Sequence, residues 1–261
     1  MLTLSRRTVM LGALAPTFPR LSWAQSDEIR VICSGGFTAA YNILAPRFEQ
    51  ITGKKVASAY GASMGNAPDA IPQRLARGEP TDIIILARPA LDDFSARSVV
   101  RPDSRVDLAE SRIGVAVRAG APKPDISTVD ALRRTLLGAS SIAYSASASG
   151  VYISTELFQR LGISAQVSGK STKILSERVG TVVARGDAEL GFQQVSELLP
   201  IPGIDYVGPL PDEVQRVTVF SAGIAADAVE QDAARALIRF FTTAAAAPVI
   251  RKTGLEPVTA P

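Results

Sequence analysis

Two short segments of glycine and serine are the first candidates for chemistry in this sequence. Ser34, Gly35 and Gly36 follow the apolar run 29–33 and precede a stretch with one apolar face at helical spacing. Glycine lets a ligand come close to the backbone, and the first amides of a helix have no partner within the helix. A strand, a small-residue turn and a helix in this order therefore predict an anion site, with an ordinary strand–turn–helix corner as the alternative. We expect ligand contacts here from Ser34, Gly35, Gly36 and Phe37.

The same plan recurs later in the chain. Residues 140–144 predict a strand, residues 145–150 a small-residue loop, and a helix follows up to Gly162. The segments 75–83 and 183–190 also match each other, because each reads as a helix end, a glycine C-cap and the start of a strand. Two α/β lobes of similar plan would produce such a repeat, and their small-residue turns would face one cleft. From this half we expect contacts from Ser147, Ser149, Gly150 and Tyr152.

Polar residues outside these turns extend the candidate site. The flexible loop 61–66 precedes a short helix, and its contributions would be Ser63, Met64 and Asn66. Lys170 could meet a carboxylate as a point charge, and Arg178, on a helix predicted over 173–185, could form a forked contact. The alternatives are a solvated lysine in a turn, a surface arginine and, for the serines, simple helix capping.

Composition excludes several classes of site. The chain has 261 residues, of which 46% are apolar and 20% charged, as in ordinary globular proteins. Its net charge of +3 comes from three arginines in residues 1–24, and the remainder has 25 basic and 25 acidic residues. This balance argues against a nucleic-acid partner. Cys33 is the only cysteine and histidine is absent, which removes intrachain disulfides, histidine triads and imidazole metal sites. We expect neither a metal nor a cofactor.

The N-terminus predicts export. Arg6 and Arg7 resemble a twin-arginine signal, and the apolar core 9–18 is shorter than the roughly 20 residues of a membrane-spanning helix. Small residues at Ser22 and Ala24 suit cleavage after Ala24, so residues 1–24 would be a signal peptide, with an uncleaved tail as the alternative. We expect a periplasmic monomer without membrane insertion.

Two strand-like segments divide the rest of the chain. Residues 111–118 and 213–222 read as crossings between lobes. Lobe one would then comprise 27–111 plus 221–261, and lobe two 112–220. Two crossings form a hinge that permits closure around a ligand.

Four segments occur in the order and spacing of a known family. They are the opening strand–turn–helix, residues 78–85, residues 148–150 and the pair Leu190-Gly191. On these segments the chain resembles the type 2 periplasmic solute-binding proteins, specifically the molybdate-binding-protein-like group, over nearly all of its length after residue 24. The resemblance implies an α/β fold of two lobes joined by two hinge crossings, with a small anionic ligand in the cleft.

The family's molybdate pocket is matched only in part. The resemblance implies ligand contacts from Ser63 and Ser149, whereas Gly36 stands where the family has a serine. Gln194 replaces the family's tyrosine, and the loop 61–67 is longer. These departures imply an organic anion larger than a tetrahedral oxyanion.

Lys170 and the pair Gln193-Gln194 further resemble a branch of this group that includes periplasmic aconitate isomerases. That activity moves a proton between the allylic carbons of a tricarboxylate, which needs a base and fixed cations or N–H groups. Without histidine the base would come from this set: Lys170, Glu177, Cys33 or a tyrosine. A lysine beside Arg178 would have a lowered pKa, because burial and like charge both disfavour its cation.

Two other functions stay open on sequence grounds. One is a non-catalytic substrate-binding component of an uptake system for a small carboxylate or oxyanion, which would have a membrane permease as its partner. The other is a binder of metal oxyanions of the molybdate type, which Gln194 disfavours. The fold cannot decide between an enzyme and a binder, because function depends on the site.

Overall fold

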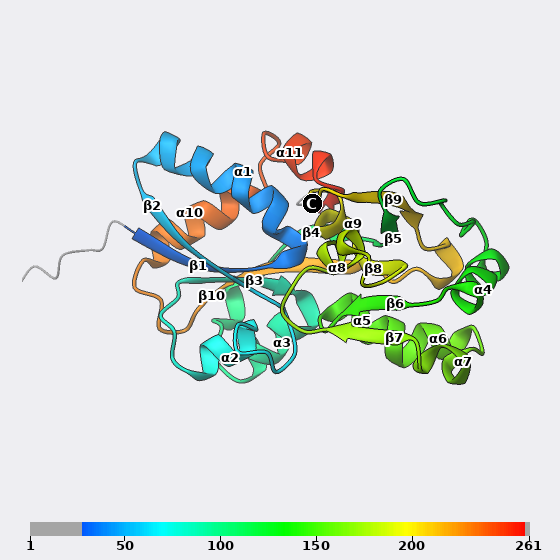
Figure 1. The fold of residues 1–261 in the computed structure, drawn as a ribbon. Coiled ribbons are helices and arrows are strands. Elements are labelled where there is room, and N and C mark those ends of the chain that lie inside the picture. Colours follow the sequence, from blue (N-terminus) through cyan, green and yellow to red (C-terminus); the bar gives the residue numbers. More distant parts are fainter. Residues whose placement is uncertain (1–27, 259–261) are drawn as a thin grey trace, which may run out of the picture.

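The computed structural model describes residues 28–258, which form two α/β lobes (Figure 1). The predicted signal peptide lies outside these residues. The strands are β1 (Glu28–Ser34), β2 (Lys55–Gly61), β3 (Ile83–Ala87), β4 (Val106–Ser111), β5 (Ile113–Arg118), β6 (Ile142–Ser145), β7 (Ser171–Ile174), β8 (Leu190–Gln194), β9 (Ile204–Pro209), β10 (Thr218–Ile224) and β11 (Leu255–Pro257). The helices are α1 (Gly35–Thr52), α2 (Ile71–Ala76), α3 (Arg88–Ala96), α4 (Val129–Gly138), α5 (Ala148–Tyr152), α6 (Phe158–Arg160), α7 (Ser164–Ser168), α8 (Val179–Arg185), α9 (Val195–Leu198), α10 (Gln231–Phe241) and α11 (Ala247–Lys252). A π-helical turn (Ile153–Leu157) joins α5 to α6, and 3₁₀ turns span Pro102–Ser104 and Asp212–Val214.

Lobe one, as the structure has it, is built on a six-stranded sheet in the order β11-β4-β10-β3-β1-β2. Strand β1 pairs in parallel with β2 and β3, whereas β10 runs antiparallel to both β3 and β4. Helices α1 and α10 lie on one face of this sheet, and α2 and α3 lie on the other (Figure 1). The central strand β3 is buried along its whole length, which explains its unbroken apolar sequence.

Lobe two is built on a five-stranded sheet in the order β7-β6-β8-β5-β9. Strand β6 pairs in parallel with β7 and β8, and β5 runs antiparallel to β8 and β9. Helix α8 packs on one face through Val179, Val182 and Val183, and the larger apolar cluster on the other face includes residues of α4 and α5. Each lobe therefore has its own core.

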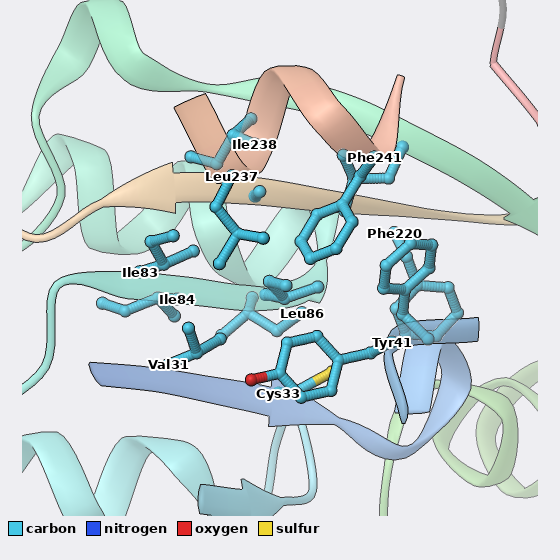
Figure 2. Close-up of a cluster of buried hydrophobic side chains, with 14 of the residues drawn as sticks. Val31, Cys33, Tyr41, Ile83, Ile84, Leu86, Phe220, Leu237, Ile238 and Phe241 are labelled. Carbon is cyan, nitrogen blue, oxygen red and sulfur yellow. The ribbon is translucent and has the colours of Figure 1, made fainter. Parts of the chain in front are cut away.

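Buried apolar side chains of the lobe-one sheet and of helices α1 and α10 pack together in the core of lobe one (Figure 2). Phe241 of α10 meets Phe37 and Tyr41 of α1 edge to face, with ring centroids 5.7 and 5.9 Å apart. All three rings are almost fully buried. This packing fixes α1 on the sheet and so fixes the direction in which its first residues point.

Two crossings join the lobes. Only Arg112 separates β4 of the first sheet from β5 of the second, and the return crossing leads from β9 to β10. The side chain of Gln215 accepts a hydrogen bond from Ile113 N at 2.9 Å and donates to Ile113 O at 3.0 Å, which ties the two crossings together. The hinge is thus a narrow, hydrogen-bonded pair of segments.

Two predicted elements differ from the structure. The stretch 111–118 is not one strand, because β4 ends at Ser111 and β5 begins at Ile113 in the other sheet. The helix predicted over 173–185 begins only at Val179, since Ser171–Ile174 forms the edge strand β7. An edge strand with two exposed residues lacks the alternation that marks a half-buried strand.

Candidate active site

A cavity of about 160 Å³ lies between the lobes, at the carboxyl ends of the parallel strands. Such ends are the usual ligand position in open α/β sheets. Lobe one contributes the end of β1 and the start of α1, and lobe two contributes the ends of β6 and β7 and the start of α8. The wall residues are Ser34, Gly35, Thr38, Tyr60, Gly61, Ala62, Asp69, Ser145, Ala146, Ser147, Ile174, Leu175, Ser176, Glu177, Arg178, Gln193 and Glu197.

Serine pairs lie beside this cavity in both lobes. Ser34 Oγ and Ser63 Oγ are hydrogen-bonded at 2.6 Å, and Ser63 Oγ also accepts from Ala87 N at 3.1 Å. In lobe two, Ser145 Oγ and Ser149 Oγ are 3.1 Å apart. Ser34, Ser145 and Ser147 line the cavity. The buried Ser63 and Ser149 do not line it, and they are the hydrogen-bond partners of Ser34 and Ser145 respectively.

Glu197, on the short helix α9, is a cavity carboxylate that lies against both lobes. Gln193 Nε2 donates to Glu197 Oε1 at 2.9 Å, and Gln193 Oε1 accepts from Val179 N at 2.9 Å. On the lobe-one side, a Cβ added to Gly35 would lie 2.1 Å from Glu197 Oε1. The carboxylate is therefore packed directly against the first residue of α1, and only glycine leaves room for it.

Helix α9 is seated at the hinge. Val195 N donates to Arg112 O at 2.9 Å, and Ser196 Oγ donates to Gly36 O at 2.7 Å. Ser196 is thus bound to lobe one, and Val195 is bound to a hinge crossing. Glu197 thus lies on the floor of the cleft.

The pKa of Glu197 differs from that of an ordinary glutamate. Burial raises the pKa to about 7, although the charge of Arg178 and the hydrogen bond from Gln193 both favour the ionised form. Burial also raises the pKa of the Cys33 thiol, to about 12, and Cys33 does not line the cavity. A carboxylate with this pKa exchanges protons near neutral pH, which is what a general base requires.

Glu177 is a cavity residue in a different electrostatic state. Arg185 holds both of its carboxylate oxygens, at 2.7 and 3.0 Å, and this hydrogen-bonded pair lowers the pKa of Glu177. Arg178, the next residue, also lines the cavity and is the N-cap of α8.

A family model for bacterial extracellular solute-binding proteins matches residues 29–256. The chain belongs to this family. Its two-lobed fold and inter-lobe cavity agree with that membership, as does the resemblance found in the sequence.

A curated relative and several solved structures are similar to this solute-binding protein. An aconitate isomerase from a Pseudomonas species is 46% identical over 254 residues, which cover 97% of each chain. The periplasmic molybdate-binding protein of Azotobacter vinelandii has a TM-score of 0.71 at 20% identity, over 89% of this chain and 100% of the other. The sulfate-binding protein SubI of Mycobacterium tuberculosis has a TM-score of 0.68 at 20% identity, over 88% and 87% of the two chains. The two solved structures share the fold of this chain, and at 20% identity the likeness shows the fold alone.

Several residues predicted as contacts lie elsewhere in this solute-binding protein. Met64 and Tyr152 line a second inter-lobe cavity of about 250 Å³, beside Arg88 and Arg216. Tyr152 donates its hydroxyl to Val214 O at 2.6 Å, and the guanidinium of Arg216 lies 4.7 Å from the centre of its ring. Through these contacts Tyr152 packs against the segment that forms the return crossing.

The other predicted contacts are placed away from the first cavity. Phe37 is a fully buried core residue, and Asn66 is exposed on its loop. Gly36 and Gly150 are packed by protein, since an added Cβ would meet the ring of Phe220 at 2.0 Å and Ser145 O at 1.6 Å respectively. Gln194 is buried and donates to Thr218 Oγ1 at 3.0 Å, whereas its neighbour Gln193 lines the cavity.

Lys170 does not line the first cavity. Its Nζ donates to Leu137 O at 2.7 Å and to Ala139 O at 2.5 Å, at the C-terminal end of α4, beyond the amino end of β7. A cation at this position donates hydrogen bonds to carbonyls that the helix leaves unpaired, and it interacts favourably with the negative end of the helix dipole. The geometry therefore corrects the assignment of Lys170 as the base and points to a structural role.

Replacing Lys170 by methionine should lower the free energy of unfolding by about 1–3 kcal/mol, because two carbonyls lose a charged donor. Denaturant titration would measure the loss. Lys173→Met is the matched control, since Lys173 is exposed on β7 and its replacement should change stability by less than about 0.5 kcal/mol. Equal stability of the two variants would contradict the capping role of Lys170.

Sequence reasoning missed Glu197, Tyr60 and Asp69 as cavity residues. Tyr60 donates its hydroxyl to Asn42 Oδ1 at 2.7 Å and is the second-last residue of β2. Its position at the carboxyl end of a parallel strand was a usable signal. Glu197 offered none, because a single glutamate in a sequence is typical of a solvated surface residue.

Proposed function

We propose that this protein interconverts trans- and cis-aconitate in the cavity between its lobes. The observation that carries the proposal is the 46% identity to an aconitate isomerase across 97% of both chains. The match extends over nearly the whole of both sequences. The cavity itself supports the proposal through the groups that line it.

The reaction has definite chemical needs. One proton leaves the methylene carbon of the substrate, another is added at the far carbon of the same allylic unit, and the double bond shifts. The negative charge that develops on the substrate spreads onto a carboxylate, where fixed cations and N–H groups stabilise it. The cavity offers carboxylates for proton transfer, the guanidinium of Arg178, the serine hydroxyls and the first amides of α1. No metal or redox group is needed for this step.

The family itself favours a second function. Solute-binding proteins bind small molecules outside the cytoplasm, so a non-catalytic binder of a small carboxylate, working with a membrane permease, is the competing proposal. The family is extracellular, and we further propose that residues 1–24 direct export as a twin-arginine signal cleaved after Ala24. Among residues 28–258, no helix is long and apolar enough to span a bilayer.

One experiment separates the two functions. Purified protein is incubated with trans-aconitate, and the cis and trans isomers are resolved by liquid chromatography over time, while calorimetry measures binding in the same buffer. We expect turnover that reaches the same isomer ratio from either direction. Tight binding of trans-aconitate without conversion would refute the isomerase and support the binder. If the protein neither binds nor converts trans-aconitate, aconitate is refuted as its ligand.

A further inference from the structure

Several titratable groups line the cavity, and their surroundings decide which of them could act as a base. Glu177 is exposed and held by Arg185, so its pKa is lowered and it is a weak base. Burial raises the pKa of Tyr60, which leaves its phenol protonated at neutral pH. Lys170 and Cys33 lie outside the cavity wall. The carboxylates of Glu197 and Asp69 remain as candidates.

Glu197 is distinguished by how it is held. Its Oε1 receives the hydrogen bond from Gln193, whose own carbonyl is fixed by the amide of Val179, so the Gln193 amide presents its NH₂ group toward the carboxylate. Gly35 closes the opposite side. The carboxylate is thus oriented by residues of both lobes. A group that reacts with two substrate carbons in turn needs such a fixed orientation.

From this geometry we propose that Glu197 is the base that carries the proton in aconitate isomerisation, a proposal that rests on the isomerase function above. The carboxylate takes a proton from the methylene carbon, and the electron pair of that C–H bond forms the new double bond with the central carbon. The pair of the old double bond takes up the proton at the other terminal carbon, which returns Glu197 to its ionised form. Nothing is oxidised or reduced. Arg178 and the first amides of α1 stabilise the charge that spreads onto the substrate in between.

Gln193 is a positioning residue in this scheme. Arg178 at the start of α8 and Cys33 of β1 interact electrostatically with Glu197, and Asp69 and Glu177 line the same cavity. Arg178 favours the ionised carboxylate by its charge and Gln193 by its hydrogen bond, and both oppose the effect of burial. The pKa of about 7 that results leaves Glu197 able both to accept and to return a proton near neutral pH.

The test compares Glu197→Gln with Glu49→Gln. Glu49 is a matched control because it is also half-buried and hydrogen-bonded, accepting from Val56 N at 2.8 Å, but it lies near the C-terminal end of α1. We expect kcat to fall by about 10²–10⁴-fold in Glu197→Gln and to stay unchanged in Glu49→Gln. The Kd of trans-aconitate should stay the same or decrease, because a negative charge is removed from the site of a trianion. Unchanged kcat in Glu197→Gln, or a loss of binding that accounts for the whole defect, would overturn the proposal.

A pH profile tests the positioning role. In the wild type, kcat/KM should rise with pH and level off above about pH 7, as Glu197 ionises. Gln193→Met removes a hydrogen bond that favours the ionised form, so the rising limb should move to higher pH while the unfolding transition stays cooperative. A rate loss with an unshifted limb would refute this role.

The remaining carboxylates provide the discriminating comparison. If Asp69→Asn or Glu177→Gln abolishes turnover while Glu197→Gln retains it, the base is assigned to that residue and our assignment is wrong, although the isomerase function stands. If the wild type binds aconitate without turnover, the isomerase function fails and Glu197 has no proton to carry. The two failures are therefore distinct.

Discussion

Replacing Asp82 by alanine is expected to lower the free energy of unfolding by about 3–5 kcal/mol, because a buried charge network loses its centre. The Asp82 side chain is fully buried. Its Oδ2 accepts from Arg30 N and Nε at 2.9 and 3.0 Å, and its Oδ1 accepts from Arg30 Nη2 at 3.1 Å and from Val229 N at 2.8 Å. One carboxylate thus ties β1 and the start of β3 to the segment that leads into α10. The variant would leave a guanidinium and several amides without their acceptor.

Denaturant titration at neutral pH measures the effect, with Asp93→Ala as the control. Asp93 is exposed and pairs at 3.3 Å with Arg97, which caps the C-terminal end of the same helix, so its loss should cost less than about 1 kcal/mol. A loss in Asp82→Ala no larger than in Asp93→Ala would show that the network contributes little to stability.

The pH dependence of stability should depend on the same residue. Burial raises the pKa of Asp82, but the hydrogen bonds from Arg30, Val229 and Glu230 outweigh it and hold the pKa below the usual range. A carboxyl group whose pKa is lower in the folded state stabilises the fold above its unfolded pKa of about 3.9. This contribution is lost as the pH falls through the folded pKa. The stability difference between the wild type and Asp82→Ala should therefore be largest near neutral pH and narrow below about pH 4.

Periodicity and turn chemistry were sufficient to predict the frame that holds the site. The apolar run before Ser34 and the helical face after Gly36 correctly predicted the β1–α1 corner, and the small-residue loop after Tyr144 predicted its counterpart in lobe two. Both corners do face one cavity. These features are local, because a buried strand and an amphipathic helix each carry their pattern within a few residues.

The chemistry inside that frame depended on distant contacts that no local pattern records. Gly35 was expected to make room for a ligand, whereas the structure uses its missing side chain to seat Glu197, which comes from the other lobe. Lys170 and Glu177 attracted attention by residue type, but a helix end and Arg185 hold them. A carboxylate becomes a plausible base only through its burial and its partners, and both are properties of the folded chain.

Replacing Gly35 by alanine is expected to lower kcat by about 10²-fold while leaving the fold intact. The new Cβ would lie 2.1 Å from Glu197 Oε1, and that atom is the end of a flexible side chain, so the carboxylate moves rather than the backbone. Alanine is a better helix former than glycine, so α1 should not be weakened. A displacement of about 1 Å at a reacting group can cost about 10²-fold in rate. Gly138→Ala is the matched control, since Gly138 is also helical and an added Cβ there meets nothing within 4 Å.

A compensating change would show that the effect acts through Glu197. Glu197→Asp withdraws the carboxylate by one methylene and should lower kcat by itself, but it also removes the atoms that the Gly35→Ala methyl group would strike. The double variant should therefore lose much less activity than the product of the two single losses, because residues in contact are not energetically independent. Steady-state kinetics of the four proteins gives the coupling directly. Strictly multiplicative losses, with all four proteins equally stable, would mean that Gly35 affects turnover by a route other than the position of the carboxylate.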